Sequence, residues 1–205
     1  MKKIVLVSFL LSAFGWLSAQ NTSYWQQHVD YKMEVSMDVK TYQYKGKQEL
    51  VYTNNSPETL TRVFYHLYPN AFSPGSEMDA RIQSIKDPDA RMVHKATVNG
   101  VETKQSRIKD LKPNEIGFLH IANFKQDGVA ASAKEVGTIL EVTLAKPLLP
   151  GAKTIFTLDF EGQVPVQIRR SGRNNKEGVE LSMTQWYPKI DRKSTRLNSS
   201  HDDVS

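Results

Sequence analysis

The sequence predicts an all-β fold: a β-sandwich domain with at most one short helix. Apolar and polar residues alternate in several segments, turn residues separate these segments at short intervals, and helical apolar spacing occurs in one short stretch. The chain has 205 residues, 39% hydrophobic and 24% charged, which is an ordinary globular composition. It is long enough for one large domain with its own core.

The first strands follow from period-two alternation. In residues 30–40, apolar side chains occupy every second position, as expected for a strand with one buried face. We expect a turn at Lys45-Gly46 and a returning strand over residues 48–53. Residues 62–68, which are rich in aromatics, predict a third strand.

The later elements are marked by turn residues. Residues 96–103 predict a hairpin because Asn99-Gly100 readily adopts the positive φ angles of a type I′ turn. Residues 138–144 and 154–160 predict two more strands. The one helix is expected near residues 77–85, where Met78, Ile82 and Ile85 have helical spacing.

Both ends of the chain are expected to lie outside the fold. Residues 1–19 combine two lysines, a short apolar run and a small-residue cleavage signal, as in a signal peptide. We therefore expect export to the periplasm, the cell envelope or the medium, without a membrane span after cleavage; an uncleaved anchor is the alternative. Residues 191–205 begin DRKSTRLNSSH, which resembles an in-frame translation of a common sequencing adapter. We expect this tail to be non-native; a natural polar tail is the alternative.

Composition and motifs exclude several classes of function. The formal net charge of +5 is too mild to favour a nucleic-acid partner, and residues 20–190 are milder still. The absence of cysteine excludes a disulfide scaffold and a thiol nucleophile. No H-E-x-x-H, G-x-S-x-G or phosphate-binding loop occurs. These residues therefore predict no catalytic residue and no metal ligand in this chain.

Three stretches together resemble one family. Residues 25–72 read WQQHVDYKMEVSMDVKTYQYKGKQELVYTNNSPETLTRVFYHLYPNAF, residues 144–165 read LAKPLLPGAKTIFTLDFEGQVP, and residues 183–190 read MTQWYPKI. They resemble the N-terminal domain of exported bacterial zinc metallopeptidases of the aminopeptidase N type. The resemblance covers residues 20–190.

The resemblance implies a fragment of a larger enzyme. In that family, a saddle-like β domain packs on a thermolysin-like catalytic domain, which carries H-E-x-x-H, a distant Glu and a Gly-x-Met-Glu-Asn motif. None of these occurs here. We therefore expect a non-catalytic domain whose zinc, peptide substrate and catalytic domain in cis belong to the intact parent. By itself, the chain is expected to be inactive.

One site residue follows from the resemblance. The family's β domain often lends a Gln or Glu from its closing segment to the pocket for the substrate's N-terminus. Gln185 is the matching candidate for substrate binding, and its alternative role is to line the domain interface. The resemblance implies interface packing for Trp186 and Tyr187.

A second hypothesis is a stand-alone envelope β-sandwich that binds a glycan or a protein. Four aromatic residues would then form a stacking platform, namely Trp25, Tyr42, Tyr44 and Trp186.

Under the first hypothesis, residues 20–190 lack the catalytic domain on which they would pack. We therefore expect an exposed apolar interface and poor solubility.

Overall fold

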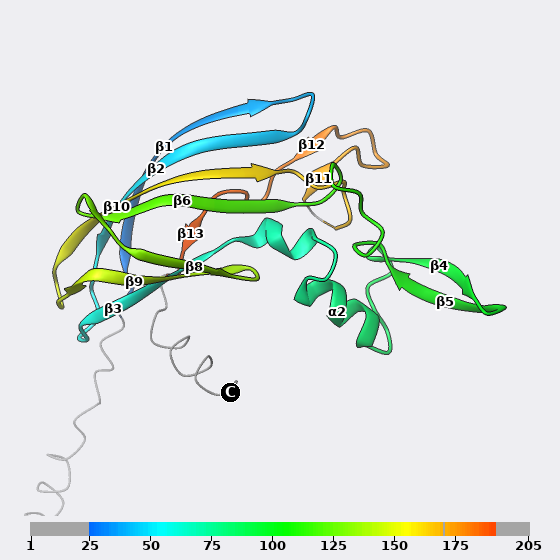
Figure 1. Ribbon diagram of the computed structural model, residues 1–205, viewed down its shortest axis with the longest axis horizontal. Coiled ribbons are helices and arrows are strands. Elements are labelled where there is room, and N and C mark those ends of the chain that lie inside the picture. Colours follow the sequence, from blue (N-terminus) through cyan, green and yellow to red (C-terminus); the bar gives the residue numbers. More distant parts are fainter. Residues whose placement is uncertain (1–24, 170, 192–205) are drawn as a thin grey trace, which may run out of the picture.

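Two antiparallel β-sheets packed face to face form the body of the protein in the computed structural model, which describes residues 25–169 and 171–191 (Figure 1). The expected signal peptide at residues 1–19 lies outside the described residues. So does the expected adapter-derived tail at residues 191–205, apart from Asp191. Within the described part, no helix is long and apolar enough to cross a bilayer.

The first sheet has five strands in the order β1-β2-β10-β6-β7. Its strands are β1 (His28–Asp38), β2 (Gln43–Thr53), β10 (Lys153–Gln163), β6 (Phe118–Gln126) and β7 (Val129–Ala130). Strands β1 and β2 pair without a register shift over eleven residues each. The pairing of β10 with β6 contains an irregularity between Thr157 and Asp159.

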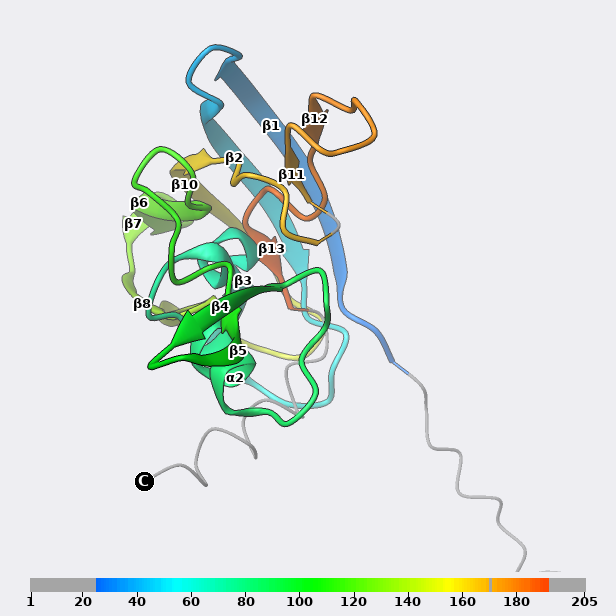
Figure 2. The ribbon, with the colours of Figure 1, turned by 90° about the vertical axis from the view of Figure 1, so that its right-hand side faces the viewer.

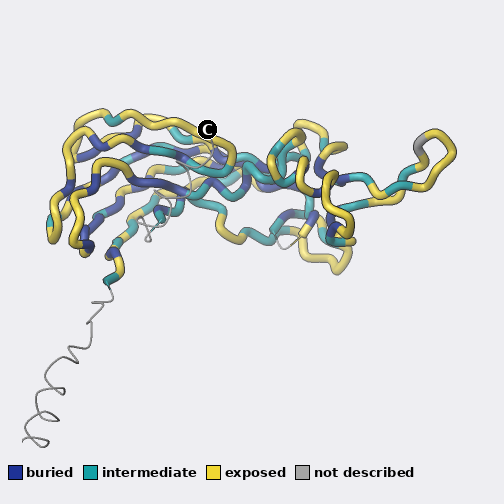
Figure 3. Tube along the Cα trace, turned by 90° about the horizontal axis from the view of Figure 1, so that it is seen from below, coloured by how far each residue is buried: buried dark blue, intermediate teal, exposed yellow. Residues whose placement is uncertain are grey.

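The second sheet has four strands in the order β13-β3-β9-β8. Its strands are β13 (Lys189–Ile190), β3 (Leu60–His66), β9 (Ile139–Leu148) and β8 (Ser132–Val136). The inner faces of the two sheets share one core, which includes Leu50, Phe156 and Val142. Figure 3 shows this burial along the strands of the sandwich.

A smaller unit, the lateral lobe (residues 76–111), projects from one end of the sandwich (Figures 1 and 2). It contains helix α2 (Glu77–Ser84) and a hairpin of strands β4 (Val93–Val98) and β5 (Val101–Ser106). The 3-10 helix η2 (Tyr68–Phe72) joins it to β3. The strands β11 (Gly172–Arg173) and β12 (Leu181–Ser182) form a short separate pair.

The all-β prediction is confirmed, and the expected strands and helix are present at shifted bounds. Helix α2 begins because the Ser76 hydroxyl accepts a hydrogen bond from the Asp79 amide at 3.2 Å, a normal N-cap. The helix ends at Ser84, well before Pro88. Asn99 and Gly100 have φ angles of 52° and 78°, as a type I′ turn requires.

The expected turn at Lys45-Gly46 is wrong, because β2 already begins at Gln43. The chain reverses after Asp38, whose carboxylate accepts a hydrogen bond from the Lys40 amide at 2.8 Å. Gly46 instead serves close packing inside the sheet. A Cβ at this position would lie 2.5 Å from the Phe160 ring and 2.6 Å from the Glu34 carbonyl oxygen, so a side chain would force these neighbours in the same sheet to shift.

Candidate functional site

The closing segment (residues 183–191) is held by a ladder of side chains from the inner face of the five-stranded sheet. The Tyr44 hydroxyl donates to the Trp186 carbonyl at 2.7 Å. The Gln48 side-chain amide donates to the Pro188 carbonyl at 2.9 Å, and the Ile190 amide donates to the Tyr31 hydroxyl at 2.9 Å. Because every second residue of the segment is bonded in this way, its backbone is fixed through side chains of β1 and β2.

Aromatic packing reinforces this ladder. The Trp186 ring lies edge-on to Tyr44, with 5.7 Å between the ring centroids, and Tyr187 lies edge-on to Tyr31 at 5.6 Å. Such edge-to-face pairs add about 0.5–1.5 kcal/mol beyond the apolar area that they bury. Burial raises the pKa of Tyr44 well above its usual value, so its hydroxyl remains a hydrogen-bond donor.

The end of the closing segment joins the other sheet. Lys189 and Ile190 form β13 opposite His66 and Tyr65 of β3, and the Asp191 amide donates to the Phe64 carbonyl at 2.8 Å. The segment therefore connects the two sheets along the side of the sandwich.

Gln185 lies at the start of this fixed segment, in the left-handed conformation with φ of 53°. Its side chain is exposed, and its amide has no hydrogen-bond partner within residues 25–169 and 171–191. It borders a pocket of about 410 Å³ between the sandwich and the lateral lobe. The other lining residues include Tyr68, Phe72, Met78, Gln163, Arg169 and Trp186.

The pocket is apolar with a few polar groups at its margin, which is the usual composition of a site for a small ligand or a partner side chain. Gln163 already donates to the Pro113 and Ile116 carbonyls, at 3.0 and 2.8 Å. Arg169 lies 3.7 Å from the Asp89 carboxylate. Gln185 is thus a polar group of the pocket that remains available to a ligand or a partner.

The aromatic platform of the second hypothesis is not formed. Tyr44 is 3% exposed and lies beneath Trp186, so it offers no face to a sugar ring. Tyr42 precedes β2 in the turn, with φ of 59°, and the Arg173 guanidinium lies 4.4 Å from its ring centroid. Because Tyr42 lies outside β2, it does not share a strand face with Tyr44.

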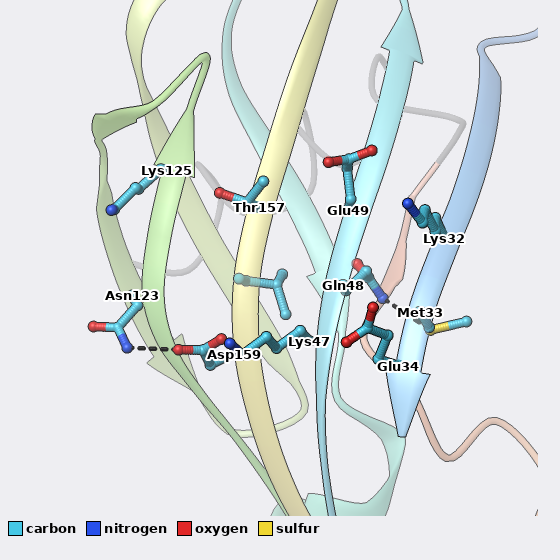
Figure 4. Close-up of a pocket in the computed structure, with 11 residues that line it drawn as sticks. Lys32, Met33, Glu34, Lys47, Gln48, Glu49, Asn123, Lys125, Thr157 and Asp159 are labelled. Atoms are coloured by element: carbon cyan, nitrogen blue, oxygen red, sulfur yellow. Dashed lines mark hydrogen bonds between the residues drawn. The ribbon is translucent and has the colours of Figure 1, made fainter. Parts of the chain in front are cut away.

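A second hollow, of about 370 Å³, lies on the outer face of the five-stranded sheet (Figure 4). Basic and acidic side chains alternate across its strands: Lys32 is opposite Glu49, and Glu34 is opposite Lys47. Asn123 donates to the Asp159 carboxylate at 2.7 Å. This arrangement is typical of a solvent-facing sheet and contains no nucleophile with an adjacent base.

The described residues do not fit a metal centre. Across residues 25–169 and 171–191, no group of three or more His, Cys, Asp or Glu side chains is placed to hold a metal ion. Among the described histidines, His120 pairs with the Glu135 carboxylate at 2.9 Å, as His28 and His94 pair with single carboxylates, and His66 stacks on Tyr68.

Comparison with known proteins finds similarity among solved structures. No family model matches the sequence, and no curated protein matches it. The M1 zinc metallopeptidase from Deinococcus radiodurans is similar with a TM-score of 0.46 and 14% identity, over 82% of this chain and 29% of that one. A two-domain M1 zinc metallopeptidase variant bound to L-arginine matches with the same TM-score and identity, over 82% of this chain and 30% of that one. The chain thus spans less than a third of these structures.

Proposed function

We propose that this chain is the N-terminal β domain of an exported zinc-dependent metallopeptidase of the aminopeptidase type. In this proposal, the domain is non-catalytic, packs on a catalytic domain in the same polypeptide and shapes the substrate cleft. The resemblance of residues 25–72, 144–165 and 183–190 to that family supports it. The observation that carries the proposal is the closing segment, which presents the exposed amide of Gln185 from a fixed backbone.

Gln185 is the proposed contact with the substrate. Its amide oxygen is a neutral acceptor suited to the ammonium group of a peptide's N-terminus. The backbone beside it is held by the bond from Tyr44 to the Trp186 carbonyl and by ring packing. Because a prepositioned acceptor loses little freedom on binding, this placement favours recognition of the substrate's end.

The zinc of the proposed parent belongs to its catalytic domain. Catalytic zinc needs three protein ligands and an open position for water, and the described residues offer no such group. In the parent, the metal would polarise the carbonyl group of the substrate and activate a water molecule. The residues of this chain bind and orient the substrate.

The first experiment reads the source genome beyond codon 190. We expect the frame to continue into H-E-x-x-H with a downstream Glu. A genome that encodes DRKSTRLNSSH followed by a stop would contradict the proposal. The chain as given, supplied with zinc, is expected to hydrolyse no peptide, and a zinc-dependent turnover would also contradict it.

The role of Gln185 is tested in the intact enzyme. Gln185→Ala removes one hydrogen bond to a charged group, worth about 1.5–3 kcal/mol, which predicts an increase in KM of roughly tenfold to a hundredfold for peptides with a free amine. Gln105→Ala, in the hairpin of the lateral lobe, is the matched control and should leave KM unchanged. An unchanged KM in Gln185→Ala would assign Gln185 to the domain interface instead.

A further inference from the structure

Strand β1 leaves one long edge of the five-stranded sheet open. Among the described residues, β1 pairs with β2 on one side and with no strand on the other. It has eleven residues, contains no proline and shows no register shift against β2. Such an edge presents unpaired backbone groups and accepts another strand unless the protein blocks it.

The residues of β1 complement those of a second β1 when the two strands run antiparallel with the two Met33 residues opposite each other. On the outer face, this register sets Lys32 opposite Glu34 of the second copy and His28 opposite Asp38. On the inner face, it sets Tyr31 opposite Val35, a side chain that is 44% exposed. Cross-strand pairs of opposite charge and of aromatic with β-branched residues both stabilise a sheet.

Neighbouring registers lack this complementarity. Centring the pair on Lys32 sets the two Lys32 residues against each other and Asp30 against Glu34. Centring it on Glu34 sets Glu34 against itself and Asp30 against Asp38. The Met33-centred register overlaps all eleven residues and opposes no like charges, so the edge favours one geometry. Figure 4 shows Lys32 and Glu34 on this outermost strand.

We propose that β1 is a dimerisation edge whose partner is a second copy of this chain, paired antiparallel about Met33. The two five-stranded sheets then form one continuous sheet. The contact is isologous, so it closes as a dimer. At the opposite edge, β7 covers only the last two residues of β6, but side chains engage β6 further along: the Leu119 amide donates to Asn70 and the Ile121 amide to Glu135, so these groups are not open to another strand. This inference does not depend on the proposed peptidase.

The first test is the mass of the purified full chain by sedimentation velocity over a range of concentrations. Strand pairing buries less surface than a standard interface, so we expect a reversible dimer with a dissociation constant of roughly 1 µM to 1 mM. A chain that remains monomeric up to about 1 mM would overturn the proposal.

The second test reverses the charges one at a time and then mixes the variants. Lys32→Glu sets two acidic residues opposite each other in the dimer, and Glu34→Lys sets two basic residues opposite each other. Each variant alone should dimerise at least about tenfold more weakly than the original chain. An equimolar mixture restores opposite charges at both positions, so it should form the heterodimer.

The mixture also separates dimerisation from folding. Within one chain, Lys32 is opposite Glu49 and Glu34 is opposite Lys47, so both variants lose a pair inside their own sheet. Mixing cannot restore those internal pairs, and recovery of the dimer therefore reports the contact between copies. Lys86→Glu, an exposed residue beyond α2, is the control for net charge and should dimerise normally. A mixture no more dimeric than its components would overturn the assigned register.

Discussion

The sandwich and the lateral lobe are held together in different ways. Among the described residues, eighteen buried residues form the sandwich core, whereas four form the smaller core beneath the lobe, namely Ile82, Met92 and Ile108 of the lobe itself and Ile168 from outside it. In the lobe, polar contacts supplement the small core: the Arg107 guanidinium donates to the Arg91 and Gln167 carbonyls, at 2.8 and 3.2 Å.

This difference predicts a difference in local stability. A two-stranded hairpin is marginal by itself, so β4 and β5 depend on the few apolar contacts beneath them. Segments with few buried contacts open with a lower free energy than the core of the same protein. We therefore expect the lateral lobe to open while the sandwich remains folded. Of four predictions, two concern how the sandwich is held and two concern the lobe.

The largest effect is expected at the centre of the sandwich. Phe156 is 1% exposed and packs between Tyr52 and Phe124, with centroid distances of 6.0 and 5.5 Å. Phe156→Ala should lower the free energy of unfolding in urea by about 3–5 kcal/mol. Ile155→Ala, on the opposite face of the same strand, should cost at most about 1 kcal/mol. Equal losses in the two variants would contradict the assigned burial.

The second effect should be confined to the lobe. Ile108 is fully buried in the smaller core, and Ile108→Ala should lower the opening free energy of the β4 and β5 amides by about 2–4 kcal/mol. Hydrogen exchange measures this opening residue by residue. The β10 amides should keep their protection in Ile108→Ala. They should also keep it in the control Val101→Ala, which changes a residue at the exposed hairpin tip. Parallel loss in β10 and the hairpin would show that the two regions unfold as one unit.

The third prediction compares two buried tyrosines of the sandwich. Tyr44→Phe leaves the Trp186 carbonyl without its donor and should cost about 1–3 kcal/mol. The Tyr65 hydroxyl is buried and has no hydrogen-bond partner in the described part of the chain. Tyr65→Phe should therefore be neutral or slightly stabilising. Urea unfolding of both variants measures these changes in the free energy of unfolding. A greater loss of stability in Tyr65→Phe than in Tyr44→Phe would contradict the hydrogen-bond assignment.

Those strands of the sandwich that bury only one of their two faces could be predicted from the sequence. Alternation located β1, β2 and β10 because their apolar residues occupy one side of each strand. It could not locate β8, whose five residues are all exposed. In β6, the pattern is interrupted near Asn123, which has a positive φ of 54°.

The geometry of the candidate site required the structure. The bond from Gln48 to the Pro188 carbonyl joins residues 140 positions apart, and no local pattern indicates such a contact. The left-handed backbone of Gln185 is equally hidden, because few residues other than glycine adopt it and glutamine carries no local signal for it. The resemblance selected Gln185, and its role as a substrate contact stays a prediction.

The smallest effect is a pH dependence confined to the lobe. Hydrogen bonds from the Arg91 side chain and amide, together with the charges of Arg91 and Arg169, hold the pKa of Asp89 well below its usual value. A depressed folded-state pKa stabilises the fold above the unfolded value of about 3.9, and this contribution is lost as the pH falls toward the folded value.

The hydrogen-exchange protection of the β4 and β5 amides should therefore decrease as the pH falls from about 5 to about 3. This decrease should be smaller in Asp89→Asn. The effect is small because the ion pair between Asp89 and Arg91 is solvent-exposed, and added salt should weaken it further. Asp87→Asn, two residues away, is the matched control, because Asp87 also has an exposed ion pair, which it forms with Lys104. Identical pH slopes in the original chain and Asp89→Asn would show that the lobe is held by the small apolar core without help from this carboxylate.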